Sequence, residues 1–289
     1  ALTETQIEVL AEANGAATGF MAALRAHDAL DLVQTPLDVE DMVAAHKEAI
    51  ERGEASDEVF SSLSRVIERS IDRRLREEGS GQRRNRVPLP RALQGAKRMA
   101  GACVFGLNLY LKDVGVTGEG LDPETVLLGL APDWSPDEVR QVLATGLFDP
   151  GYLGRVRFHH RRSMEWLSAR WLHDLMSSGC PLKTVVDLLI PQAFEVRRVP
   201  EAYVVTAAWL ASLHDGFRRE AIKFAPALLI GFGDPGALPI EDRVAALRAF
   251  VAGYGEREET GARFAASMLK RFAAEPLAAS VVELMSEPS

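Results

Sequence analysis

Two consecutive histidines, His159 and His160, lie between a short predicted strand and a predicted helix. Neighbouring strand residues point to opposite faces, so His160 shares a face with the apolar Phe158. A helix start favours an anion, because its first backbone N–H groups are unbonded and the helix dipole is positive there. An imidazole at this position can donate to a phosphate oxygen, and Arg161 or Arg162 would add positive charge. Chemically, His160 could therefore contact a phosphate group.

Other chemistry is open to these residue types. His160 could instead be structural, bonding Glu165 or a backbone carbonyl. Its spacing to His173 fits no metal site, and no Gly-x-Ser-x-Gly elbow supports nucleophilic catalysis. The stretch 231–236 matches Gly-x-Gly-x-x-Gly, but Pro235 removes a backbone donor and the flanks are helical, so it predicts an interhelical turn. We therefore predict no catalytic residue and no metal ligand.

Composition predicts a mainly α-helical protein. The chain has 289 residues, of which 47% are hydrophobic and only 7% aromatic, and its net charge is −8. The acidic balance argues against a nucleic-acid partner. Two cysteines, Cys103 and Cys180, fit a reducing cytoplasm, and no apolar run is long enough for a membrane helix. The start at Ala1, without methionine, is what an interior fragment of a longer chain would show.

The pattern of apolar residues and turn signals places the elements that must position His160. Residues 1–78 predict helices, the first capped by Thr5 and the clearest over 56–78, and 79–90 predict a linker. The histidines are preceded by a helix over 91–110, by short helices at 122–130 and 135–145, and by two strands within 147–158. A turn at Asp149-Pro150-Gly151 joins the two strands. After Trp171 we expect helices separated by tight turns, stacked like a solenoid, over 204–213, 218–230, 240–252 and 261–272.

The segment from Phe158 to Ala169 resembles the end of the winged-helix module in STAND-class NTPases, the NACHT and apoptotic-ATPase kind. Those proteins carry Phe-x-His-x-x-x-x-Glu followed by an apolar, alanine-bearing helix, here Phe158, His160 and Glu165. The Thr-Pro-Leu stretch around Pro36 is similar to the family's helical-lid element. Two positions depart from the family pattern, where Gln34 replaces a glycine and Met164 replaces a glutamine.

This resemblance implies a helical lid over 1–80, a winged helix with one small β-hairpin over 81–172, and an α-solenoid-like helical-repeat arm over 173–289. It implies that His160, aided by Arg161, contacts the phosphates of ATP or ADP and that Pro36 packs on the adenine. The chain has no Gly-Lys dipeptide and hence no phosphate-binding loop. The nucleotide site would be completed by a phosphate-binding (P-loop) domain of the parent NTPase.

The expected function is that of a regulatory fragment of a bacterial signalling or anti-phage defence protein, itself without enzymatic activity. A protein trigger would act on the helical arm. One alternative is a self-contained α-helical scaffold for protein–protein interaction. Another is a winged-helix DNA binder using Arg155, Arg157, Arg161 and Arg162, which the negative net charge opposes.

Overall fold

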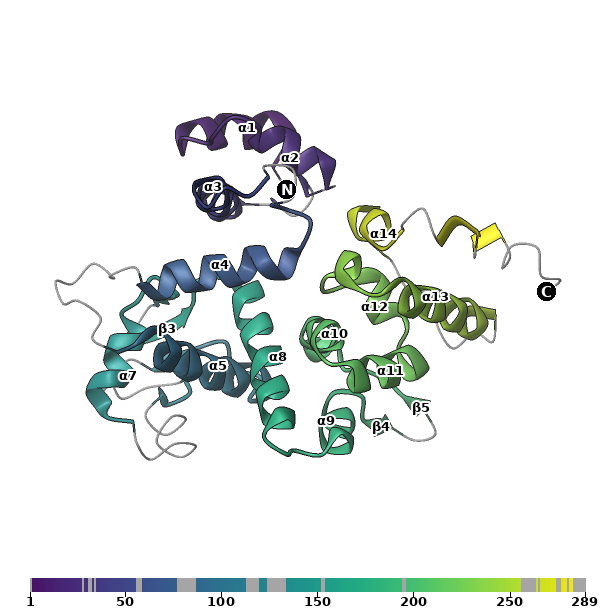
Figure 1. The fold of residues 1–289 in the computed structure, drawn as a ribbon. Coiled ribbons are helices and arrows are strands. Elements are labelled where there is room, and N and C mark those ends of the chain that lie inside the picture. The colour runs from purple at the N-terminus through teal and green to yellow at the C-terminus, as the bar shows by residue number, and fades with distance from the viewer. Residues whose placement is uncertain are drawn as a thin grey trace. The chain divides into compact units, whose positions relative to one another are not determined.

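The computed structural model describes two compact units of a mainly helical chain (Figure 1). Unit 1 comprises residues 1–66 and 215–289, and unit 2 comprises residues 67–214. The described residues are 2–27, 29–30, 33, 35–55, 59–76, 87–112, 120–123, 134–151, 154–193, 196–255, 264, 266–273, 277–279 and 281–282. The prediction of a mainly α fold is confirmed. None of the described helices combines the length and apolarity needed to cross a membrane.

Unit 1 is built from two separate stretches of chain. The first contains α1 (Glu4–Ala13), α2 (Phe20–Ala26), α3 (Pro36–Glu51) and the start of α4 (Leu63–Arg76). The second contains α11 (Asp215–Phe224), α12 (Ala227–Gly231), the short helix η5 (Pro235–Ala237), α13 (Ile240–Gly255) and α14 (Ala266–Phe272). Both α1 and α3 begin with a capping box, from Thr3 with Gln6 and from Thr35 with Asp38.

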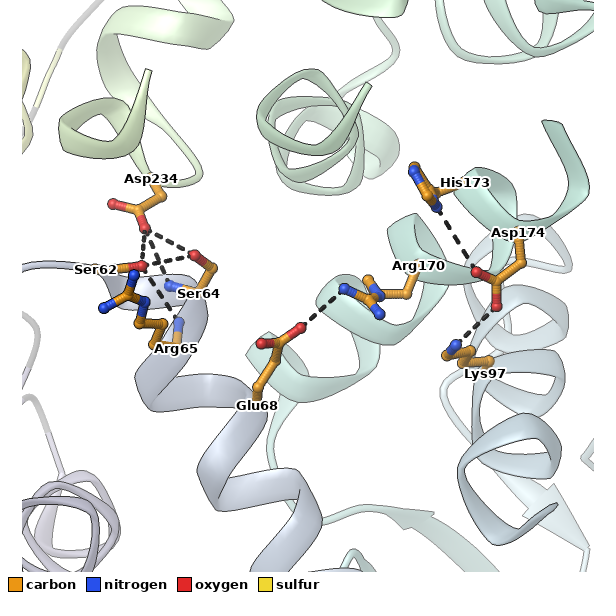
Figure 2. A network of polar contacts seen from close by, with 9 residues as sticks. All are labelled: Ser62, Ser64, Arg65, Glu68, Lys97, Arg170, His173, Asp174 and Asp234. Carbon is orange, nitrogen blue, oxygen red and sulfur yellow. Dashed lines mark hydrogen bonds and ion pairs between the residues drawn. The ribbon is translucent and has the colours of Figure 1, made fainter. Parts of the chain in front are cut away.

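Polar contacts join the two stretches of unit 1. Oδ2 of Asp234, a fully buried residue, accepts hydrogen bonds from the Ser64 backbone N at 3.1 Å and from both serine hydroxyls, Ser62 Oγ and Ser64 Oγ (Figure 2). Arg271 donates to the Phe60 carbonyl at 3.0 Å. We call the contact of Asp234 with Ser62 and Ser64 the Asp234 clasp. It satisfies a first-turn amide of α4 that would otherwise lack an acceptor.

Unit 2 contains the rest of α4 and a helical core. The remaining elements are α5 (Leu89–Phe105), β1 (Leu111–Lys112), α7 (Pro136–Leu143), β2 (Phe148–Pro150), β3 (Arg155–Phe158), α8 (Arg161–Ser177), α9 (Leu182–Leu189), β4 (Gln192–Ala193), β5 (Val196–Arg197), η4 (Glu201–Tyr203) and α10 (Val204–Leu213). Helix α8 packs against α5 and α10, and Trp166 meets Trp209 edge-to-face with ring centres 5.0 Å apart.

A small antiparallel sheet leads into α8. Its strand order is β1-β3-β2, with Phe148 opposite Phe158 and Leu111 opposite Val156. The predicted strand pair within 147–158 is thus confirmed. Asp149 and Pro150, expected in the turn, belong instead to β2, since the chain reverses after Pro150. The prediction of one hairpin alone was incomplete, because β1 and the β4–β5 pair also form and are too short to show an alternating pattern.

Several predicted helix boundaries were wrong. Helix α1 starts after Thr3 rather than Thr5, and α5 ends at Phe105 rather than near Tyr110. Helix α4 starts at Leu63, not at Ser56, and Val59 and Phe60 lie in a turn before it. A tertiary contact, the Asp234 clasp, lies at its first turn, where no local pattern could indicate it.

Further along the chain, the predicted helix over 218–230 is two helices, α11 and α12, broken at Pro226. The helix expected over 122–130 lies largely outside the described residues. The division into segments 1–80, 81–172 and 173–289 stays a prediction.

Candidate functional site at helix α8

The residues expected to contact phosphate lie at the junction of β3 and α8. Phe158 turns into the core, where its ring centre is 4.6 Å from that of Phe148. This pairing fixes the register of β3 and hence the position at which the strand ends. His159 follows on the other face, and its Nδ1 lies 2.6 Å from Asp149 Oδ1. His159 is therefore tied to the neighbouring strand, whereas His160 is the residue that leads into the helix.

His160 is the N-cap residue of α8. Its backbone is extended, its carbonyl accepts from Met164 N at 3.2 Å, and its side chain makes no capping hydrogen bond. The imidazole is half-buried and meets the His159 ring edge-on. The first turn of α8 contains no acidic residue, and Arg161 and Arg162 occupy its first two positions. Local charge at this helix start is therefore positive, as an anion would require.

Arg161 and Glu165 form an ion pair along α8. The Arg161 Nε lies 2.8 Å from Glu165 Oε1, and the arginine side chain is 67% exposed while the glutamate is buried. Burial raises the pKa of Glu165, an effect that the hydrogen bond from Arg161 opposes. Glu165, considered above as a bonding partner for His160, thus accepts from Arg161. The Arg161 side chain still has most of its surface in solvent.

Pro36 lies in the other unit, at the first position of α3, where its fixed φ suits a helix start. Pro36 is exposed, and the Thr35–Asp38 capping box bonds the backbone N–H groups at the same helix start. The structure therefore brings His160 and Arg161 together and places Pro36 in a separate unit. Gln34, the neighbouring departure from the lid pattern, lies outside the described residues.

A pocket of about 250 Å³ opens beside the middle of α8, among residues that the sequence did not single out. It is lined by α4, α5 and α8, through Glu68, Ile71, Asp72, Leu93, Lys97, Trp166, Leu167 and Arg170. Each helix contributes residues three or four positions apart, which is the spacing of one helix face. No local sequence pattern relates these charged positions to one another, and only the packing of three helices brings them together.

Ion pairs bridge the helices around this pocket (Figure 2). Arg170 on α8 binds Glu68 on α4 at 2.9 Å, and Lys97 on α5 binds Asp174 on α8 at 2.7 Å. His173 Nδ1 lies 3.7 Å from Asp174 Oδ1. These contacts fix the polar side chains of α8 against both neighbouring helices.

Among the described residues, no three His, Cys, Asp or Glu side chains gather as a metal site would need. The Gly231–Gly236 motif lies between α12 and α13, where Asp234 forms the clasp. Burial raises the pKa of the Cys103 thiol to about 12, so this cysteine is no nucleophile at neutral pH. Comparison with protein-family models, with curated proteins and with solved structures gives no match for this chain.

Proposed function

We propose that this chain is the regulatory part of a nucleotide-dependent signalling switch, in which His160 contacts the phosphates of bound ADP. The observation that carries the proposal is the makeup of the β3–α8 junction. A half-buried imidazole precedes a 17-residue helix whose first turn has two arginines and no carboxylate. This residue set fits a phosphate group, because imidazole N–H, guanidinium and backbone N–H groups are all donors.

The order of elements around His160 favours a winged helix. Helix α5, strand β1, helix α7 and the β2–β3 hairpin follow one another, and β3 lies between β1 and β2. In this interpretation β2 and β3 form the wing, and α8 is the helix that leaves the module. The winged helix would thus hold His160 at a fixed point, the end of its last strand.

In the intact protein, ADP would supply negatively charged phosphate oxygens as hydrogen-bond acceptors. His160 would donate to them, and Arg161 would add charge by turning away from Glu165. Pro36 would offer an exposed apolar ring for the flat face of the base. Loss of these contacts would shift a two-state equilibrium toward an open form, and the helices after residue 173 would respond to the trigger.

The chain by itself should hydrolyse no nucleotide, because it has no Gly-x-x-x-x-Gly-Lys-Ser/Thr loop. The reading frame distinguishes the two candidate functions: a phosphate-binding loop encoded upstream of Ala1 would support the switch, whereas a start codon at Ala1 would support a self-contained scaffold. ATP hydrolysis by the pure chain would contradict the assignment of a purely regulatory role.

The decisive experiment uses the polypeptide in which this chain is joined to its phosphate-binding domain. His160→Ala should speed ADP release about tenfold, which corresponds to about 1.5 kcal/mol for one hydrogen bond to a charged group. Release is followed with a fluorescent ADP analogue. The matched control is His173→Ala, which removes a half-exposed histidine from the same helix. Equal release rates in the two variants would refute the contact.

A protein-interaction scaffold is the second candidate, and one observation favours it. Leu107 and Leu109 follow α5 with 69% and 50% of their surface exposed. Exposed leucines of this kind are common at protein interfaces when they belong to a contiguous apolar patch. In that case the histidine substitution would leave nucleotide binding unchanged, and Leu107→Ser would reduce partner binding.

A further inference from the structure

The lining of the pocket beside α8 contains a carboxylate that the neighbouring cations do not pair with. Of its four charged lining residues, Arg170 is paired with Glu68, and Lys97 is paired with Asp174. Asp72 is the remaining one, and within the part of the chain that the structure describes it has no hydrogen-bond or ion-pair partner. Both cations of the lining are thus paired with carboxylates, one of which, Asp174, lies outside the lining. Counted together with Asp174, the charged groups sum to −1, and Asp72 carries the unpaired charge.

The base of the pocket is apolar and closely packed. Ile71, Trp166 and Leu167 are buried, and Trp166 is backed by the Trp209 ring. At about 250 Å³ the space is below the roughly 300–1,000 Å³ of pockets for drug-sized molecules. The occupant is therefore small, with a short apolar body and one polar end.

From this charge and shape, we propose that the pocket binds an organic ammonium ion with a short alkyl chain. The ammonium group would donate to the Asp72 carboxylate, and the alkyl chain would contact the apolar base. A partly desolvated carboxylate without a counter-ion gains from such a partner, since hydrogen bonds between ionised groups are stronger than neutral ones. An anion would have to displace Glu68 or Asp174 from a cation. The proposal does not depend on nucleotide binding at His160.

Isothermal titration of the whole chain with n-butylammonium tests the proposal. We expect a dissociation constant on the order of 1 mM, given the few atoms involved. Asp72→Asn, which keeps the side-chain shape, should weaken binding about tenfold. Glu68→Gln should also weaken it, because it frees the Arg170 charge in the pocket. The matched control is Asp137→Asn on α7, an exposed carboxylate outside the pocket lining, which should leave binding unchanged.

Two further ligands test whether the sign of the ligand's charge matters and whether the ammonium group belongs to a protein side chain. Butyrate, of similar length and opposite charge, should bind more weakly than butylammonium. Nα-acetyl-lysine methylamide carries the same ammonium group as a protein side chain, and tighter binding of it would identify the source as a lysine of a partner protein. Absence of butylammonium binding up to about 20 mM would overturn the proposal, as would equal affinity in Asp72→Asn with an unchanged melting temperature.

Discussion

At the scale of single residues, two buried charged groups of unit 1 depend on specific partners. Asp234 is fully buried and holds the start of α4. Arg243 is also buried and donates to the backbone carbonyls of Gly236, Leu238 and Phe272. Burial lowers the pKa of Arg243, and the negative charge of Asp234 opposes that shift. Each of these buried charges thus needs partners within the protein to replace the water that it loses on folding.

Asp234→Ala should destabilise the protein by about 2–4 kcal/mol, because it removes the acceptor of the Ser62 and Ser64 donors and the negative charge near Arg243. Asp234→Asn keeps an acceptor oxygen for Ser64 and should cost less. Urea unfolding of both variants gives the two free energies. Asp137→Ala, at an exposed position, is the control. A loss below about 1 kcal/mol for Asp234→Ala would show that the clasp contributes little.

His46 should make stability depend on pH. It is fully buried, stacks on Phe60 and meets Phe20 edge-on. Burial lowers its pKa from the ordinary value of 6.5. The unfolded chain therefore takes up a proton before the folded one does, and stability falls as pH drops below 6.5 toward the lower folded-state pKa.

For a single histidine, the loss at His46 can be at most about 1.4 kcal/mol per pH unit within that window. Urea unfolding at about pH 7.5 and about pH 5.5 measures it. His46→Phe should flatten the pH dependence, because it removes the buried titrating group. An unchanged slope in His46→Phe would assign the pH effect to other groups.

At the scale of elements, helix α5 packs closely against α8, the helix that carries the candidate site. Gly101 on α5 faces the Trp171 ring of α8, and a Cβ on Gly101 would lie 2.5 Å from it. Gly95 similarly faces Trp134. Glycine therefore permits this packing, although it is a poor helix former.

Gly101→Ala should destabilise the protein by about 1–3 kcal/mol, since the clash exceeds the gain of about 1 kcal/mol in helix propensity. With Trp171→Ala in the background, the same substitution should become neutral or stabilising. The double-mutant cycle is measured by urea unfolding. Additive effects of the two substitutions would mean that Gly101 and Trp171 do not meet.

Local sequence signals predicted some elements correctly and failed where an element or site depends on residues far away in the sequence. Ser135-Pro136 marks the start of α7 because its cap and its first-turn proline are local features. Phe158 and His160 could be placed at a strand end because residues two positions apart in a strand lie on the same face of the sheet. The start of α4 and the pocket at Asp72 and Lys97 depend on partners many residues away, and no local pattern indicates them.

At the scale of the whole molecule, the units differ in how the chain builds them. Unit 2 is one continuous stretch, whereas unit 1 needs residues 1–66 and 215–289 together. A fragment of residues 63–214, which keeps α4 intact, should therefore unfold cooperatively on its own. A fragment of residues 1–66 should not, since it lacks the Asp234 clasp. Circular dichroism during thermal unfolding distinguishes these outcomes, and a non-cooperative 63–214 fragment would contradict the division.

The central claim, that His160 is a phosphate contact, is tested most directly by an ADP-bound structure of the polypeptide joined to its phosphate-binding domain. The distance to measure is from the nearer ring nitrogen of His160 to the nearest phosphate oxygen. The account predicts a hydrogen bond of about 2.7–3.2 Å. A ring nitrogen more than about 5 Å from every phosphate oxygen, with no water between them, would contradict it.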